Sequence, residues 1–382
     1  MIIESAKRLN QTSEYYFSRK LKEVRALAAA GKPIINMGIG SPDLPPPPHV
    51  IDALTKSLLD GPAHQYQSYK GLPELTKAMS EFYEARYGVS LDAESEILPL
   101  MGSKEGIMHI SMAFLNPGDE VLIPNPGYPT YTSVTRLVEA EPVYYNLDAS
   151  NNWMPDYEAL AKKDLSKVKL MWVNYPHMPT GAKATTADFE ELVAFAKTNS
   201  ILLVNDNPYS FILNENPQSI LSIAGAKEVA IELNSLSKSF NMSGWRVGML
   251  LGSSDYINTV LTVKSNMDSG MFYGIQKGAA AVLKEDKEWF NELNQVYKSR
   301  REHMWKLADL IGCTYDKNAA GMFIWAKLPE GAGDAEAFID DILINKSVFL
   351  TPGSIFGSQG AGYIRFSLCV TEDKIKEAIG RF

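Results

Sequence analysis

The middle of the chain alternates short apolar runs with longer stretches of helical pattern, and this alternation limits the possible fold more than any other feature. Five runs have the composition of buried strands stopped by Pro, Asn or Ser: EVLIPNP (120–126), EPVYYNL (141–147), KLMWVNYP (169–176), ILLVNDNP (201–208) and VAIELNSLSKS (229–239). Between two of them, residues 186–198 carry an apolar stripe at helical spacing that begins after Thr185 or Thr186. This succession predicts an α/β fold in which a mostly parallel sheet is sandwiched between helices.

The pattern changes after a long charged helix that we expect over residues 285–310. Isolated strands mixed with helices follow it, in GMFIWAKLP, SVFLTPGS and YIRFSLCV. We therefore predict a large domain over residues 46–284 and a smaller α+β domain formed by residues 1–45 and 285–382. The four prolines of GSPDLPPPPHV are expected to make a stiff crossing between them.

Charge and cysteine content exclude several classes of function. The formal net charge is -8, and no basic run is present, which argues against a nucleic acid or an anionic membrane as partner. No segment reaches 18 uninterrupted apolar residues, so we expect neither a signal peptide nor a membrane span, and we predict a cytoplasmic location. Cys313 and Cys369 are far apart in sequence and lack metal-ligand spacing, so we expect two buried thiols and no bound metal.

Polar residues follow the predicted strands at the points where the strands end. Asn174, Asp206 and the segment 235–238 should meet at the carboxyl edge of the sheet, where open α/β sheets bind ligands. Lys238 is either a lysine that extends from this edge into water or a desolvated amine. Desolvation lowers the pKa of a lysine until the neutral amine can attack carbonyl groups.

The stretch SLSKSFNMSGWRVG (235–248) indicates a site for an anion. Arg246 can bind phosphate oxygens with both arms of its guanidinium, and Ser235 and Ser237 can donate hydroxyl hydrogen bonds to the same group. GSKEGI (102–107) predicts a glycine-led turn that opens a helix, whose free N–H groups favour a phosphate, although many helices begin with Gly-Ser. In YIRFS, Arg365 is suited to binding a carboxylate.

These motifs together resemble a known family. The sequences GSKEGI, PNPGYPTY, NYPHMPTG, NDNPYS, SLSKSFNMSGWRVG and YIRFS, in this order, cover most of the chain. The set resembles the class I/II aminotransferases of pyridoxal phosphate fold type I, most closely the branch that contains aspartate and LL-diaminopimelate aminotransferases. This resemblance implies pyridoxal 5'-phosphate as cofactor and a homodimer with shared active sites.

The resemblance also implies a role for each matching position. Lys238 would form a Schiff base with the cofactor and move a proton at the substrate Cα. Asp206, otherwise a plain turn-forming residue, would pair with the pyridine nitrogen, and Tyr209 would hydrogen-bond the ring phenolate oxygen. The remaining positions are Tyr128 against the ring face; Ser103, Lys104, Ser235, Ser237 and Arg246 at the phosphate; Tyr66 at the phosphate of the second subunit; and Arg365, Gly40, Tyr15 and Asn266 near the substrate.

One position departs from the family pattern. Family members have an asparagine immediately before PTG that donates to the ring phenolate, whereas this chain has Met178, preceded by His177. A thioether cannot donate a hydrogen bond, so we predict a raised pKa for the Schiff-base nitrogen. Whether His177 compensates is left open.

The resemblance predicts an aminotransferase that moves an amino group between an amino acid and a 2-keto acid, with an acidic or diaminopimelate-like substrate. Lys104 could contact the distal carboxylate of such a substrate or only the phosphate and solvent. A β-eliminating carbon-sulfur lyase on the same fold is the alternative. A regulatory protein with an aminotransferase-like sensor domain would need an additional DNA-binding domain, for which the chain has no room.

Overall fold

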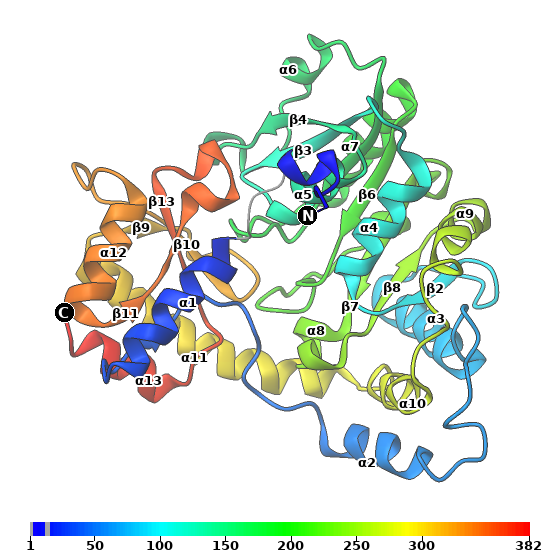
Figure 1. Cartoon of the computed structure of the whole chain (residues 1–382), viewed down its shortest axis with the longest axis horizontal. Coiled ribbons are helices and arrows are strands. Elements are labelled where there is room, and N and C mark those ends of the chain that lie inside the picture. The colour runs from blue at the N-terminus through cyan, green and yellow to red at the C-terminus, as the bar shows by residue number, and fades with distance from the viewer. Residues whose placement is uncertain (1–2, 12–15) are drawn as a thin grey trace.

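In the part of the chain that the structure describes, residues 3–11 and 16–382 of a computed structural model, a seven-stranded sheet forms the centre of the larger part of the molecule (Figure 1). Its strands, in spatial order, are β2 (Ile97–Leu100), β8 (Gly248–Leu251), β7 (Ala230–Ser235), β6 (Leu202–Asp206), β5 (Val168–Val173), β3 (Glu120–Asn125) and β4 (Glu141–Asn146). The strands from β7 to β4 pair in parallel, and β8 is antiparallel to both of its neighbours. The prediction of a mostly parallel sheet is confirmed.

Both faces of this sheet are covered by helices, because its strands are apolar on both sides. Val121 and Ile123 of β3 belong to one core cluster, and Leu122 between them belongs to another. The helices around the sheet are α2 (Pro48–Ser57), α3 (Pro73–Tyr87), α4 (Ser103–Phe114), α5 (Pro129–Leu137), α6 (Tyr157–Ala161), α7 (Thr186–Asn199), α8 (Leu236–Ser239), α9 (Ser254–Lys264) and α10 (Tyr273–Val282). Apolar side chains of α4, α5 and α9 join the first cluster, and those of α3, α7 and α10 join the second.

The smaller part contains two short sheets within the described residues. One has the order β12 (Thr351–Pro352), β13 (Tyr363–Ser367), β10 (Phe323–Lys327), β9 (Thr314–Tyr315) and is antiparallel; the other pairs β1 (Ile35–Asn36) with β11 (Val348–Phe349) in parallel. Its helices are α1 (Tyr16–Ala29), α11 (Lys287–Ile311), α12 (Ala335–Lys346) and α13 (Glu372–Ile379). The long helix α11 runs from the larger part into the smaller one (Figure 1).

Short 3₁₀ turns complete the described secondary structure. They are η1 (Lys7–Gln11), η2 (Ala149–Asn151), η3 (Ile220–Ser222), η4 (Ala226–Glu228), η5 (Ser243–Trp245), η6 (Gly353–Phe356) and η7 (Ser358–Gly360). The turn η1 lies against α5 of the larger part, whereas α1 lies beside the smaller part (Figure 1). The domain boundaries expected from the sequence stay a prediction.

Capping side chains set the first residues of two expected helices, α7 and α11. Helix α7 begins after Thr185, whose hydroxyl accepts from the N–H of Asp188 while the Asp188 carboxylate accepts from the Thr185 N–H. Helix α11 begins two residues later than expected, because the Asp286 carboxylate accepts from the Glu288 N–H and caps it there.

Three expectations from the sequence need correction. Strand β4 is half exposed, because it lies at the edge of the sheet and pairs only with β3. Lys238 does not end a strand, since β7 stops at Ser235 and the lysine stands on the single-turn helix α8. Cys313 is buried as expected, but Cys369 is only half-buried.

Candidate active site

The carboxyl ends of three neighbouring strands bring the expected polar residues together. Asn174 directly follows β5, Asp206 is the last residue of β6, and Ser235 is the last residue of β7. All three line one cavity of about 520 Å³. The other predicted site residues that line it are Gly40, Ser103, Lys104, Tyr128, Tyr209, Ser237, Lys238, Arg246 and Arg365.

Two described site residues that were predicted from the sequence do not line this cavity. Tyr66 is 91% exposed in the single chain. Asn266 is also exposed, and its amide donates to the carbonyl of Thr262 at 2.8 Å. Tyr15 lies outside the described residues.

Lys238 extends from α8 to the opposite wall of the cavity. Its ammonium nitrogen donates to the carbonyl oxygen of Gly40 at 2.6 Å. Gly40 has no side chain to block this contact, and a Cβ there would collide with the Phe323 ring. Burial lowers the pKa of Lys238 below its usual value, which shifts the side chain toward the neutral amine that attacks carbonyl groups.

Asp206 is buried beside an aromatic residue that sequence reasoning missed. The Tyr131 hydroxyl donates to Asp206 Oδ2 at 2.9 Å, and its ring stacks on Trp172 with 4.8 Å between the centroids. Tyr131 stands one helical turn after Tyr128 in PNPGYPTY, and that spacing was the available signal. The other carboxylate oxygen, Oδ1, has no hydrogen-bond partner among the described residues, although it is buried. Burial raises the pKa of Asp206 to about 7.

This raised pKa predicts how the stability of the cofactor-free protein depends on pH. Between about pH 4 and pH 7 the folded protein keeps a proton on Asp206 that the unfolded chain releases, so the free energy of unfolding falls as the pH rises. Asp206→Asn removes this group, and wild type should lose about 4 kcal/mol more than the variant between pH 4 and pH 8. Urea unfolding of both proteins across this range measures the difference, and parallel pH profiles would refute the prediction.

The phosphate-binding residues predicted from the sequence gather at the start of α4. Gly102 precedes this helix with a φ of +87°, and a Cβ there would overlap the guanidinium of Arg246. Desolvation, followed by the nearby Arg246 charge, lowers the pKa of Lys104. The Ser235 hydroxyl donates to the Ser237 hydroxyl at 2.7 Å. Two cations, two hydroxyls and a helix N-terminus make this end of the cavity suitable for a dianion.

Arg365 also lines the cavity. It is 4% exposed, and its guanidinium donates to the Gly38 carbonyl oxygen at 2.8 Å. Its central carbon lies 4.0 Å from the ring centroid of Phe323 and 4.8 Å from that of Phe356. Both rings lie outside the YIRFS stretch and carry no local motif, so sequence reasoning missed them. A buried guanidinium between aromatic faces is well placed to bind a carboxylate with two parallel hydrogen bonds.

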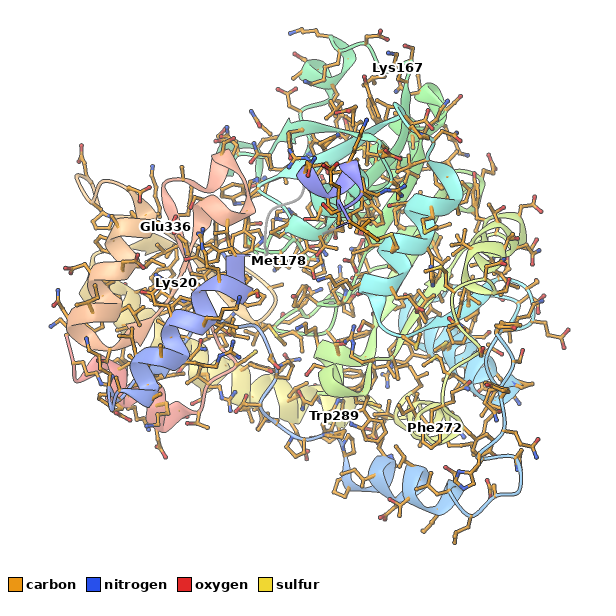
Figure 2. All side chains as sticks on the ribbon, in the orientation of Figure 1. Lys20, Lys167, Met178, Phe272, Trp289 and Glu336 are labelled. Carbon is orange, nitrogen blue, oxygen red and sulfur yellow. The ribbon has the colours of Figure 1, made fainter. Side chains whose placement is uncertain are left out.

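Met178 lies between the two parts of the molecule and lines the same cavity (Figure 2). Its sulfur accepts a hydrogen bond from Arg365 Nη1 at 3.4 Å. The Asn174 amide donates to the Asp206 carbonyl, and its Oδ1 accepts from the Met178 N–H. His177 does not line the cavity, and its Nδ1 lies 2.9 Å from the Thr180 hydroxyl. The possibility that His177 compensates for Met178 therefore finds no support.

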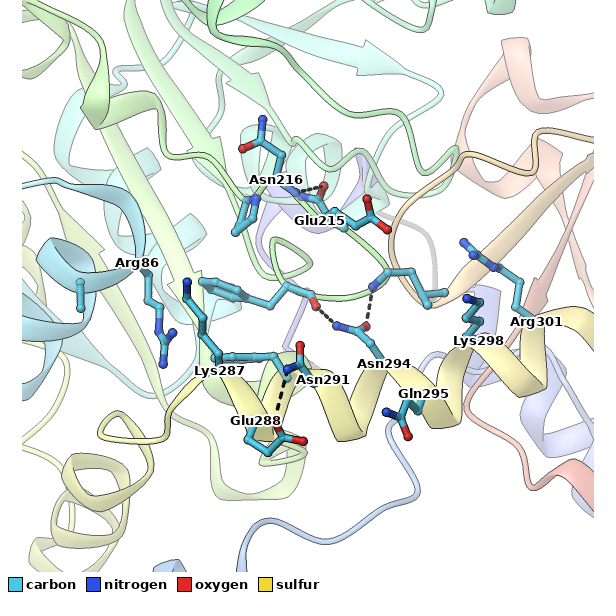
Figure 3. A pocket seen from close by; sticks show the side chains of 16 residues that line it. Arg86, Glu215, Asn216, Lys287, Glu288, Asn291, Asn294, Gln295, Lys298 and Arg301 are labelled. Carbon is cyan, nitrogen blue, oxygen red and sulfur yellow. Dashed lines mark hydrogen bonds between the residues drawn. The ribbon is translucent and has the colours of Figure 1, made fainter.

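The loop after Tyr209 is held by the helix that joins the two parts. Asn294 of α11 accepts from the Leu213 N–H at 2.6 Å and donates to the Phe211 carbonyl at 2.8 Å (Figure 3). These contacts lie at a second cavity of about 750 Å³, whose wall includes Lys287, Lys298 and Arg301 along α11 (Figure 3). Helix α11 thus holds Phe211 and Leu213, which follow Tyr209 in the same loop. Burial raises the pKa of Tyr209, so its hydroxyl keeps its proton.

The donor groups of the active-site cavity fit a phosphorylated pyridine ring. The cationic end at Arg246 and Lys104 suits the phosphate. The buried Oδ1 of Asp206, which lacks a partner in the described residues, suits a pyridinium N–H. Lys238 lies in the same cavity, where its amine can reach an aldehyde.

Comparisons with known proteins agree with this site. Residues 32–382 match the family described as Aminotransferase class I and II. An LL-diaminopimelate aminotransferase of Dehalococcoides mccartyi is 41% identical over 378 residues, which span 98% of this chain and 97% of the relative. The structure of apo-BacF from Bacillus subtilis has a TM-score of 0.95 at 36% identity, covering 100% of this chain and 98% of that one. An aminotransferase from Staphylococcus aureus has a TM-score of 0.90 at 32% identity, covering 99% and 98%.

The match to the family extends over more than half of the chain. The relatives named above are more than 30% identical to it, and the alignments cover nearly the whole chain. The motifs read from the sequence are those that surround the cavity. The chain therefore belongs to the class I and II aminotransferases.

Proposed function

We propose that this pyridoxal phosphate enzyme takes the amino group from a diaminopimelate-like amino acid and passes it to a 2-keto acid. The observation that carries the proposal is that Lys238, Asp206 and Arg365 open on one cavity. The substrate class follows the relatives, since enzymes named LL-diaminopimelate aminotransferase are about 40% identical over nearly the whole chain.

The residues of the cavity divide the work of such a reaction. The bound cofactor supplies an electron sink for the carbanion at the substrate Cα. Arg365 binds and orients the α-carboxylate. Lys238 holds and moves the Cα proton, and its lowered pKa makes the amine a better proton acceptor at a given pH than an exposed lysine. The Asp206 carboxylate keeps a proton on the pyridine nitrogen.

Lys104 is the proposed contact for a distal carboxylate. It stands at the second position of α4 and lines the cavity, as do the predicted phosphate-binding residues Ser103 and Arg246. A plain contact with the phosphate remains the other role for this side chain.

Addition of single amino acids to the cofactor-loaded protein tests the function. The absorbance of the bound cofactor should fade with LL-diaminopimelate and return when a 2-keto acid such as 2-oxoglutarate is added. A donor that leaves the absorbance unchanged is not a substrate. The lyase alternative predicts ammonia and a keto acid without any acceptor, and none of the relatives described above supports it.

Met178 should alter the spectrum of the bound cofactor. Met178→Asn introduces an N–H donor beside the ring phenolate, so the midpoint of a spectral pH titration should fall by about one pH unit relative to wild type. Met178→Leu, which also lacks a donor, should keep the wild-type midpoint. Equal midpoints for wild type and Met178→Asn would contradict the prediction that the missing donor at residue 178 raises the pKa.

A homodimer is the second part of the proposal. Tyr66 and Met267 are 91% and 58% exposed, and they belong to segments that meet where Gly270 approaches the backbone of Gln67. Phe272, labelled in Figure 2, is 46% exposed. A second copy covering these side chains would bring Tyr66 to the phosphate end of the other cavity. Sedimentation at micromolar concentration tests this, and a monomer would contradict it.

The cellular location stays a prediction. Among residues 3–11 and 16–382, no helix is both long enough and apolar enough to span a bilayer.

A further inference from the structure

Four charged or titratable side chains gather beneath the phosphate end of the cavity and have no part in the reaction described above. Glu105 and His109 stand one turn apart on α4, with Oε1 and Nε2 separated by 3.1 Å. Lys264, the last residue of α9, forms an ion pair with Asp268. His109 is 3% exposed and Lys264 is fully buried. We call these four residues the α4–α9 cluster.

The cluster combines possible metal ligands with a cation of its own. The ligand atoms of Glu105, His109 and Asp268 lie within 4.8 Å of one another, a spacing that a metal could use. The Lys264 ammonium already lies on the Asp268 carboxylate and supplies the positive charge that a metal would bring. A buried ion pair is costly to break because removal of one partner leaves the other charge unpaired. The cluster therefore places the Glu105–His109 pair of α4 next to the Lys264–Asp268 pair at the end of α9.

Backbone contacts extend this connection in two directions. Toward the cofactor site, Glu105 Oε2 accepts from the Met101 N–H at 2.5 Å, just before the phosphate-binding turn. Toward the surface, Asp268 Oδ1 accepts from the Gly270 N–H at 2.8 Å. Gly270 has a φ of +87°, and a Cβ there would lie 2.5 Å from the carbonyl oxygen of Gln67. Tyr66 immediately precedes Gln67 in the chain.

We infer that the α4–α9 cluster positions Tyr66 relative to the phosphate-binding turn of the same chain. In a two-fold dimer, these two parts of one chain serve two different sites: the turn serves its own cavity, and Tyr66 serves the cavity of the other copy. A small error in their spacing would separate the Tyr66 hydroxyl from the phosphate in both sites. This inference rests on the proposed cofactor site and dimer, and it makes the four residues positioning residues.

Paired substitution tests this role without leaving a buried charge. Lys264→Met combined with Asp268→Asn removes both charges of the ion pair, so the fold should survive. The dissociation constant of pyridoxal phosphate is measured by absorbance on cofactor-stripped protein, at concentrations where sedimentation shows a dimer. The paired variant and Tyr66→Phe should each bind the cofactor about tenfold more weakly, which is the usual size of one lost hydrogen bond to a charged group. The matched control is the surface ion pair of Lys197 and Glu228, whose paired change to Met and Gln should leave the affinity unchanged.

The decisive measurement combines all three substitutions. If the cluster acts through Tyr66, the triple variant should also bind about tenfold more weakly than wild type, because the hydroxyl is already lost. A loss of about a hundredfold would mean independent effects and would overturn the inference, as would an unchanged affinity in the paired variant. A paired variant that is monomeric would also overturn it, since the role would then be assembly. Wild-type protein that binds no cofactor would instead refute the proposed function, and the inference with it.

Discussion

Replacing Lys238 with alanine should lower the rate of each half reaction by at least about 10⁴-fold, the upper range for loss of a positioned acid and base. The amine of Lys238 lies in the cavity with Asp206, and burial lowers the pKa of this amine. Alanine has no amine, so the substitution leaves the Cα proton without an acceptor. Rapid-mixing absorbance of a single half reaction measures the rate directly. Borohydride treatment of the wild-type protein with pyridoxal phosphate should attach the cofactor to residue 238, as a peptide map would reveal.

Lys287→Ala is the matched control for this experiment. Lys287 is exposed and lines the second cavity along α11, so its loss should change the rate less than about twofold. If the Lys238→Ala protein retained more than about a hundredth of the wild-type rate, another group would have to move the proton.

Replacing Arg365 with lysine should lower kcat/KM about 10³-fold, mostly through a higher KM. The guanidinium is buried between the rings of Phe323 and Phe356, and an ammonium keeps the charge but cannot form two parallel hydrogen bonds with a carboxylate. The loss corresponds to about 4 kcal/mol, which is reasonable for two charge-assisted hydrogen bonds in a dry site. Steady-state kinetics with one amino donor measure both constants.

Arg301→Lys provides the comparison for Arg365→Lys. Arg301 is half-buried, donates to the Ala319 carbonyl at 3.2 Å and lies over the Trp305 ring, but it faces the second cavity. Its substitution should leave the KM for the amino donor unchanged. A change in KM of less than about threefold for Arg365→Lys would mean that Arg365 is not the carboxylate-binding residue.

Much of the fold could be predicted because its signals are local. The runs 120–126, 169–176 and 201–208 are apolar on both faces, and only a strand covered on both sides accommodates this pattern. The parallel order then places Asn174, Asp206 and Ser235 at one edge. The exposure of β4 could not be predicted, because an edge strand is defined by the neighbour that it lacks.

The candidate site divides in the same way. Lys238, Asp206, Arg246 and Arg365 could be found from motifs, since each stands in a short stretch with a chemical reason of its own. The hydrogen bond from Tyr131, the rings around Arg365 and the α4–α9 cluster join residues far apart in the chain. A local pattern can mark one of these residues, as the spacing from Tyr128 marks Tyr131, but it does not specify the distant residue that is contacted.

The sequence by itself determined which strands and helices form, because burial and capping depend on residues a few positions apart, and it predicted which polar side chains meet at the candidate site. The tertiary structure alone decided the environments of those side chains. Folding closes a cavity around Asp206 and raises its pKa to about 7, and it places the rings of Phe323 and Phe356 around the Arg365 guanidinium. The physical reason is that desolvation and charge interactions depend on distance through space, which the order of residues along the chain does not contain.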